Sequence, residues 1–174
     1  MLGMNVMLLA LLEMQYVKNQ RIQEQIAGKV LRFHVLANSD TAEDQNLKLA
    51  VRDAVGSRMA ELLSDVQDRE ACEQVVEAHL PEIAETAQAV VREAGYEYEV
   101  HAAIEETEFP SKTYGKFTFP AGKYEALRVV IGEGEGHNWW CVMYPNMCFG
   151  GSMYEVVDES AGEELKKVLS KEEY

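Results

Sequence analysis

The sequence contains few cysteines, and their spacing excludes the common cysteine-based metal sites. Only three occur in 174 residues, at Cys72, Cys141 and Cys148. No two of them form a Cys-x-x-Cys motif, and no His/Cys cluster has zinc-ligand spacing, so we expect neither a metal site nor a cofactor. Three cysteines cannot all pair within one molecule, but Cys141 and Cys148 could form a disulfide if the chain works outside the cytoplasm.

Basic residues are also scarce. The chain carries 16 Lys and Arg against 30 Asp and Glu, which gives a net charge of −14 at pH 7. Because an acidic chain without a basic stripe repels a phosphate backbone, we expect no nucleic acid partner. Attraction to an anionic membrane surface is disfavoured for the same reason.

The apolar run at the N-terminus is too short to span a bilayer, which needs about 20 apolar residues. It reads MLGMNVMLLALL over residues 1–12, and a polar, helix-compatible segment follows from Glu13 to Lys29, ending near Gly28. The run has the length of the apolar part of a signal peptide, but it lacks a basic n-region and a clear cleavage site. Three interpretations stay open: an export signal with a misassigned start, an uncleaved amphipathic anchor, and a helix packed on the core.

The next segments alternate between strand and helix patterns. Residues 30–37 predict a strand with apolar side chains on one face and Arg32 and His34 on the other. A helix is predicted to follow as far as about Leu63, and Asp40 with Glu43 has the spacing of a capping box at its start. A second helical region covers residues 68–94, with a break or kink at Pro81 and a stop at Gly95.

The later segments complete the expected fold. Residues 96–105 alternate strictly and predict a strand with one buried and one solvated face. Residues 107–122 predict a loop or a short edge hairpin with exposed aromatic side chains, and residues 158–173 predict a surface helix. The sum is a two-layer α+β domain with a mostly antiparallel sheet of about four strands packed against two main helices. We divide the chain into an N-terminal segment (1–29), this domain (30–152) and an acidic C-terminal helix or tail (153–174).

The most distinctive stretch runs from Tyr124 to Phe149 and contains both tryptophans of the chain. Two strand-like runs flank Gly132-Glu133-Gly134-Glu135-Gly136-His137-Asn138. Because glycine permits positive φ and tight reversals, we predict that the two runs form a hairpin. The glycine alternation is not a phosphate loop, since it lacks the Lys-Ser/Thr pair and its two carboxylates would repel phosphate.

One catalytic hypothesis concerns Cys141. A thiol nucleophile would need His137 or His34 as its base, oriented by Asp40 or Asn38. The competing interpretation is a buried strand cysteine, because free cysteine is among the most buried residue types. Asn38, Ser39 and Asp40 are likewise explained as turn and cap residues.

A second hypothesis concerns partner binding. Adjacent strand residues point to opposite faces, so Trp139 and Trp140 cannot both line one core. One of them should be exposed or lie in a groove, and tryptophan and tyrosine dominate binding hot spots. The predicted contact residues lie on this stretch and on the preceding loop: Trp139, Trp140, Tyr144, His137, Asn138, Tyr114 and Phe117.

Three stretches resemble the stage II sporulation protein R family of endospore-forming Firmicutes. They are IGEGEGHNWWCVMYPNMCF after a YEALRVV strand, RFHVLANSD followed by Glu43-Asp44-Gln45, and YGKFTFPAG at residues 114–122. The resemblance covers roughly residues 30 to 150.

This resemblance implies a protein without enzymatic activity that acts as a signal during sporulation. Such a protein is made in the forespore and exported to the space between forespore and mother cell, and family members typically carry an export signal at the N-terminus. There it activates a membrane-embedded aspartic protease in the septal membrane, which processes the precursor of the early mother-cell sigma factor. The alternative, from the residues alone, is a cell-envelope thiol hydrolase that uses Cys141 with a histidine base.

Overall fold

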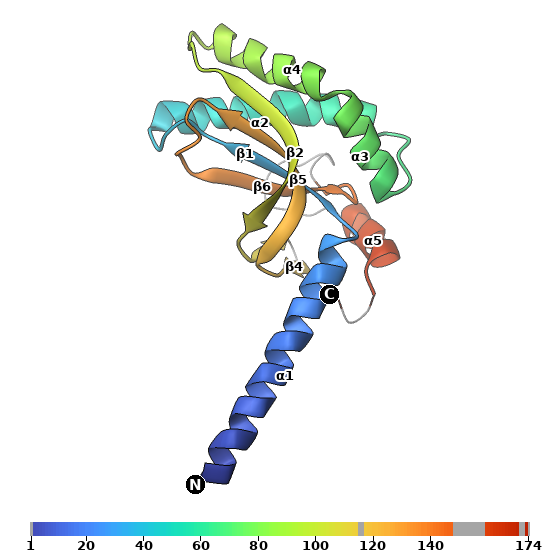
Figure 1. The fold of residues 1–174 in the computed structure, drawn as a ribbon. Helices are drawn as coiled ribbons and strands as arrows, with labels where there is room; N and C mark the ends of the chain where they lie inside the picture. The colour runs from blue at the N-terminus through green and yellow to red at the C-terminus, as the bar shows by residue number, and fades with distance from the viewer. Residues whose placement is uncertain (1, 115–116, 148–158, 171–172, 174) are drawn as a thin grey trace.

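The structure, a computed structural model, has the predicted α+β fold (Figure 1). It describes residues 2–114, 117–147, 159–170 and 173. Its elements in chain order are α1 (Leu2–Ala27), β1 (Leu31–Leu36), α2 (Ala42–Leu62), α3 (Arg69–Ala78), α4 (Leu80–Glu93), β2 (Val100–Phe109), β3 (Lys112–Tyr114), β4 (Phe117–Phe119), β5 (Gly122–Ile131), β6 (Asn138–Tyr144) and α5 (Glu159–Val168).

The main sheet has four strands in the order β2-β5-β1-β6, and β1 lies at its centre. β1 runs parallel to β5, with Phe33 opposite Leu127, and antiparallel to β6, with Phe33 opposite Cys141. The predicted hairpin of β5 and β6 is therefore wrong. β1 lies between the two strands and bonds to both, so the segment between them must cross over the end of β1.

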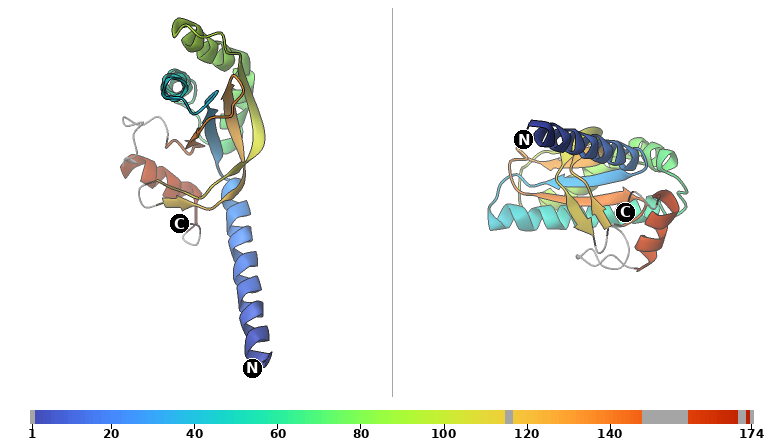
Figure 2. Two further views of the ribbon diagram at one scale, coloured as in Figure 1. Left: turned by 90° about the vertical axis from the view of Figure 1, so that its left-hand side faces the viewer. Right: turned by 90° about the horizontal axis from the view of Figure 1, so that it is seen from below.

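Helices α2, α3 and α4 cover one face of this sheet (Figures 1 and 2). The predicted apolar face of β1 packs here, and all six residues of β1 are buried. Burying one large apolar side chain of this strand, such as Phe33, contributes about 1.5–3 kcal/mol to the stability of the fold. The core on this face includes Leu31, Phe33, Val35, Val51, Val55, Met59, Val76, Ile83, Val91, Leu127 and Met143.

The second face of the sheet is covered as well. Its core combines strand residues with the end of α1, the small β3–β4 sheet and α5, in the cluster Ile26, Val30, Phe109, Phe117, Phe119, Tyr124, Ala126, Val142, Leu165 and Leu169. Residues 117–119 form a short strand as one alternative predicted, but Phe117 and Phe119 are only 3% and 2% exposed. The expected exposure of these two aromatic rings is wrong, because they fill the second core.

The helix boundaries follow local sequence signals. The N-cap of α2 is Thr41 rather than Asp40, and the Thr41 side chain accepts a hydrogen bond from the backbone N–H of Asp44. The predicted break at Pro81 is confirmed, since Pro81 lies in the first turn of α4 after α3 has ended. Gly95, with φ of 83°, ends α4 as predicted.

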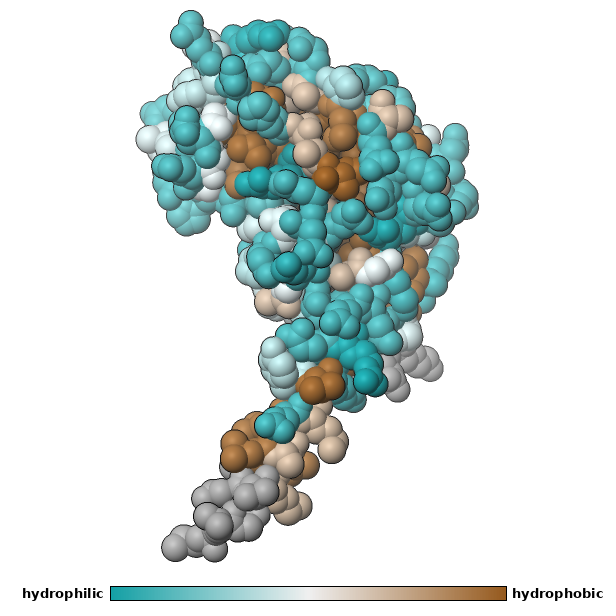
Figure 3. Space-filling model, viewed as in Figure 1, coloured by the Kyte–Doolittle hydropathy of each residue, from teal (hydrophilic) through white to brown (hydrophobic). Residues whose placement is uncertain are grey.

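Helix α1 points away from the rest of the molecule over most of its length (Figure 2). Its exposed apolar side chains include Met7, Leu9, Leu11, Leu12, Met14, Tyr16 and Val17, and Figure 3 shows hydrophobic surface along this part of the helix. Only the last turns pack on the domain, where Ile26 is 1% exposed and Gln23 donates a hydrogen bond to the Lys123 carbonyl. The packed-helix interpretation therefore fails for all but these last turns. Among the described residues, no helix is both long and apolar enough to cross a membrane.

Helix α5 lies where a C-terminal helix was predicted, and its Leu165 is fully buried in the second core. Glu173 is anchored to the start of the sheet, because both of its carboxylate oxygens accept hydrogen bonds from Lys29 Nζ, at 2.9 and 2.7 Å. Burial would raise the pKa of Glu173, but the bonds from Lys29 and Ser170 lower it overall. The three-part division of the chain stays a prediction.

Candidate functional site

The residues that join β5 to β6 run across one end of the sheet. We call residues 132–137 the crossing loop. It passes over the carboxyl end of β1, where its backbone bonds to the turn that follows this strand: Gly136 N donates to the Ala37 carbonyl at 3.0 Å and Glu135 N to the Asn38 carbonyl at 3.2 Å. The side-chain oxygen of Asn38 also accepts a bond from Glu133 N, at 3.1 Å.

Glycine is required at this crossing because the two backbones lie so close. Gly132 and Gly134 have φ values of 57° and 66°, which favour glycine. A Cβ at Gly136 would overlap the carbonyl of Ser39 and lie 2.9 Å from the Ala37 side chain. The predicted role of these glycines in a tight path is confirmed, although the path is a crossing and not a hairpin turn.

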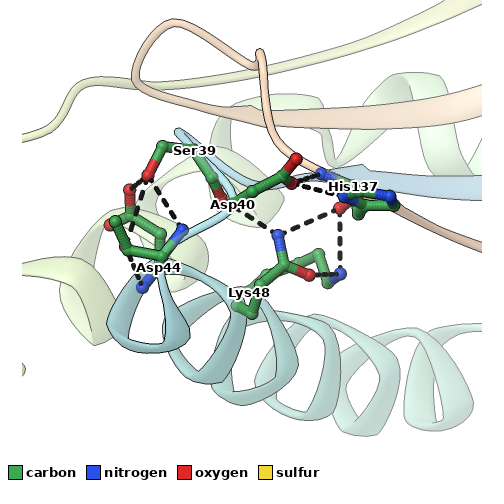
Figure 4. Close-up of polar contacts among 7 residues, drawn as sticks. Ser39, Asp40, Asp44, Lys48 and His137 are labelled. Carbon is green, nitrogen blue, oxygen red and sulfur yellow. Dashed lines mark hydrogen bonds and ion pairs between the residues drawn. The ribbon is translucent and has the colours of Figure 1, made fainter.

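A polar network holds the turn beneath the crossing loop (Figure 4). Its centre is Asp44, which is 3% exposed and accepts hydrogen bonds from Asn38 Nδ2 at 2.8 Å and from Ser39 Oγ at 2.6 Å. Burial would raise the pKa of the Asp44 carboxyl, but these bonds lower it overall. The carboxylate thus fixes two turn residues that in turn hold the loop.

Two α2 side chains hold the far end of the loop. Lys48 Nζ donates to the His137 carbonyl at 2.9 Å and to Gln45 Oε1 at 2.5 Å, while Gln45 Nε2 donates to the Ser39 carbonyl at 3.0 Å. Burial and the nearby charge of Arg52 lower the pKa of Lys48. The start of α2, the turn after β1 and the crossing loop therefore form one connected unit.

Asp40 and His137 form the exposed surface of this unit (Figure 4). Asp40 Oδ1 lies 2.5 Å from both the backbone nitrogen and the ring Nδ1 of His137. These side chains are 55% and 82% exposed, respectively. The contacts with His137 lower the pKa of the Asp40 carboxyl. The pair presents an oriented imidazole and a carboxylate to any molecule that contacts this end of the sheet.

The thiol-hydrolase arrangement is only partly assembled. Asp40 contacts the His137 ring as predicted, but Cys141 lies four residues further along the chain, about 13 Å from His137 at strand spacing. Cys141 is 5% exposed and belongs to the core beneath the helices, whereas the side chain of His34, its diagonal neighbour across the strand pair, lies on the opposite face of the sheet. Cys141 is disulfide-bonded, and the predicted partner Cys148 lies outside the described residues, so the Cys141–Cys148 pairing stays a prediction. Among the described residues, no group of three or more His, Cys, Asp or Glu side chains is arranged to hold a metal ion.

The two tryptophans point to opposite faces, as predicted. Trp139 packs against Phe33 in an edge-to-face contact with a centroid distance of 5.5 Å, and the Arg52 guanidinium lies 5.3 Å from its ring. Trp140 stacks on His34 at a centroid distance of 3.7 Å. Both tryptophans are half-buried.

Arg32 lies at the centre of the second face and is fully buried. Its Nε donates to the Cys141 carbonyl at 2.9 Å and one of its Nη atoms to Tyr114 Oη at 3.0 Å, and Tyr114 Oη donates to the Trp140 carbonyl at 3.1 Å. Burial lowers the pKa of Arg32, and the interaction with Tyr114 opposes this shift. The guanidinium also lies 4.2–5.8 Å from the ring centroids of Phe109, Tyr114, Phe119 and Tyr124.

The predicted contact residues do not form one cluster. His137 and Asn138 lie at the crossing loop, and Tyr144, whose Oη donates to the Gln67 carbonyl, lies at the other end of β6, about 20 Å away at strand spacing. Tyr114 is half-buried against Arg32, and Phe117 is in the core. Their proposed roles in binding stay predictions, but in this conformation Phe117 cannot contact a partner with its side chain.

We call Asp44, Gln45 and Lys48 the clamp, because together they hold the turn after β1 and the crossing loop. We did not predict from the sequence that these three residues act together, nor that Arg32 is buried. The signal for the clamp was present, since Glu43-Asp44-Gln45 and the crossing loop both belong to the stretches that resemble one family. For Arg32 the strand pattern indicated the correct face, but no local signal indicated that distant aromatic residues would cover it.

Comparison with known proteins agrees with the resemblance. The model of the Stage II sporulation protein R family matches residues 27–154. Stage II sporulation protein R of Bacillus subtilis (strain 168) is 36% identical over 147 residues, which are 84% of this chain and 62% of that relative. The chain thus spans less than two thirds of the length of this relative. No solved structure matches the chain.

Proposed function

Because the chain belongs to the Stage II sporulation protein R family and so has a role in sporulation, we propose that it is an exported signalling protein of that process. It acts in the space between forespore and mother cell, where it activates a membrane-embedded aspartic protease of the septal membrane. The activated protease then processes the precursor of the early mother-cell sigma factor. Family membership over most of the chain is the observation that carries this proposal.

The mechanism that suits such a chain is activation by contact. A ligand shifts an equilibrium between inactive and active protease only by binding the active state more tightly. The clamp at the crossing loop supports this role, because it holds Asp40 and His137 in fixed positions at the surface. Groups that are ordered before binding lose less entropy on binding.

Co-expression in a host that does not sporulate tests the proposal. The exported chain, the septal protease and the sigma-factor precursor are produced together, and cleavage of the precursor is followed by gel shift. We expect cleavage only when all three are present. Absence of cleavage, with a chain that is folded and exported, would overturn the proposal.

A Cys141→Ala variant separates the ligand from a thiol hydrolase. A contact ligand keeps most of its activity if the variant is folded, whereas a hydrolase that uses this sulfur loses all of it. Circular dichroism and thermal unfolding confirm the fold of the variant before cleavage is scored. Because Cys141 is disulfide-bonded, abolished cleavage with an intact fold would show that activity needs either this disulfide or the free sulfur of a hydrolase.

A further inference from the structure

Strand β2 forms one edge of the main sheet, and only β5 pairs with it in the described part of the chain. The pairing is regular over all ten residues, from Val100 opposite Ile131 to Phe109 opposite Gly122, without a bulge. β2 lies at the outer margin of the sheet in the left view of Figure 2. Such an edge is a template for pairing with another strand.

The hydrogen bonds at the start of β2 show which backbone groups point outward. Val100 N donates to Gln88 Oε1 at 3.0 Å, away from β5, whereas the Glu99 carbonyl accepts a bond from Gly132 N, at 2.9 Å, on the β5 side. Outward and inward groups alternate along an antiparallel strand. The outward row therefore continues through Ala102, Ile104, Glu106 and Glu108.

Apart from its charged glutamates, this row lacks most of the common protections of an edge strand. Gln88 of α4 covers only its first residues, through Val100 N and the Tyr98 carbonyl. Within β2 there is no proline, lysine or arginine, and its pairing has no bulge. These are the devices by which edge strands commonly avoid pairing with other chains.

The charges on β2 indicate what kind of segment can pair with it. The strand carries Glu105, Glu106 and Glu108 and no Lys or Arg. From β5, Arg128 donates a hydrogen bond to Glu105 at 2.6 Å and Lys123 donates one to Glu106 at 2.8 Å. Two copies of β2 paired edge to edge would bring like charges together across the new ladder, which is destabilising. A segment with basic residues is complementary.

We propose that the free edge of β2 is the docking surface for an extended, basic segment of the septal protease, which adds a strand to the sheet. The outward N–H and C=O groups of Ala102, Ile104, Glu106 and Glu108 bond to this segment, and the carboxylates select its charge. The half-buried side chains of Ala102 and Ile104 offer it apolar contact. This inference rests on the function proposed above and adds the surface and the chemistry of the partner.

A pair of substitutions at Glu106 tests the edge in the co-expression system. Glu106→Pro removes an outward N–H, and proline is tolerated at an edge position whose N–H faces solvent. Glu106→Ala removes the same carboxylate but keeps the N–H. Because Glu106→Ala alters the charge of the docking edge, it is the reference for the proline variant. We expect Glu106→Pro to give about tenfold less cleavage than Glu106→Ala, the effect of losing one backbone hydrogen bond.

The outcomes separate the two proposals. If the unaltered chain produces no cleavage, the proposed function fails. If the unaltered chain activates the protease and folded Glu106→Pro activates it as well as Glu106→Ala does, the function stands and the docking edge is wrong.

Photo-crosslinking keeps the test decisive if the proline variant does not fold. A photoreactive amino acid is placed at Glu108 on β2, and at the exposed Glu70 on α3 as a matched acidic control. We expect a crosslink to the protease from position 108 and none from position 70. The reverse pattern, or no crosslink at 108 while cleavage proceeds, would overturn the docking surface.

Discussion

At the scale of single residues, Gly136 shows how closely the crossing loop approaches the end of β1. Gly136→Ala would place a methyl group onto the Ser39 carbonyl, a backbone atom that cannot move aside without shifting the clamp. We expect a loss of about 1–3 kcal/mol in the free energy of unfolding, as for other overpacked sites. Denaturation in urea, with circular dichroism as the signal, measures this loss.

Gly28→Ala is the matched control. A Cβ at Gly28 would lie 3.6 Å from its nearest neighbour, the Glu24 carbonyl oxygen, at ordinary contact distance. We expect its effect to be within about 0.5 kcal/mol, as for most surface substitutions. Equal losses at both glycines would mean that the close approach at Gly136 is not what requires glycine there.

At the scale of elements, the sequence indicates most helices and strands but not their neighbours. Periodicity predicted β1 and α2, because burial on one face leaves a local pattern. The β-branched and aromatic residues predicted the strand character of β5 and β6, and the proline predicted the break at Pro81. The placement of β1 between β5 and β6 leaves no such pattern, since it depends on a pairing across about 100 residues. The same holds for Arg32, which was assigned to the correct face but is buried by aromatic rings from β2, β3, β4 and β5.

Helix α1 provides a prediction at this scale, because its two parts differ in what they contact. Met7 is 67% exposed and Leu12 56%, whereas Ile26 is 1% exposed in the second core. Deleting residues 1–19 should change the free energy of unfolding by less than about 0.5 kcal/mol. Extending the deletion to residue 27 should cost about 2–5 kcal/mol, mainly from the loss of Ile26.

Thermal and urea unfolding of the two truncated chains compare these values. The intact chain is the reference, and the retained Ile26 makes the shorter deletion the control for the longer one. A large loss from the shorter deletion would show that the exposed part of α1 contributes to the stability of the domain.

At the scale of the whole molecule, the coverage of both sheet faces makes stability depend on a buried histidine. His34 is 2% exposed, and its ring stacks on Trp140. Burial, together with the nearby Arg128 and Arg32 charges, lowers the pKa of His34 from 6.5 to about 3, although the Asn138 side chain opposes the shift. The folded protein therefore holds this imidazole in its neutral form.

The sign of the pH effect follows from proton linkage. Below pH 6.5 the unfolded chain binds a proton at His34 that the folded chain does not bind. The contribution of His34 to the free energy of unfolding is therefore complete above pH 6.5, and it is lost as the pH falls toward about 3. The slope of the free energy of unfolding approaches about 1.4 kcal/mol per pH unit for one such group. The pKa values of Asp44 and Glu173 are lowered in the folded protein. Their ionised carboxylates therefore stabilise the folded state at neutral pH, and this stabilisation is lost mainly below about pH 5.

The measurement is urea unfolding between about pH 6.5 and 5, where the His34 contribution dominates. His34→Phe keeps an aromatic ring against Trp140 but cannot bind a proton, and we expect the slope in this range to decrease by most of its value. His101→Gln alters an exposed histidine and should leave the slope unchanged. An unchanged slope in His34→Phe would mean that His34 becomes protonated in the folded state, which requires the second core to admit water or to open at mildly acidic pH.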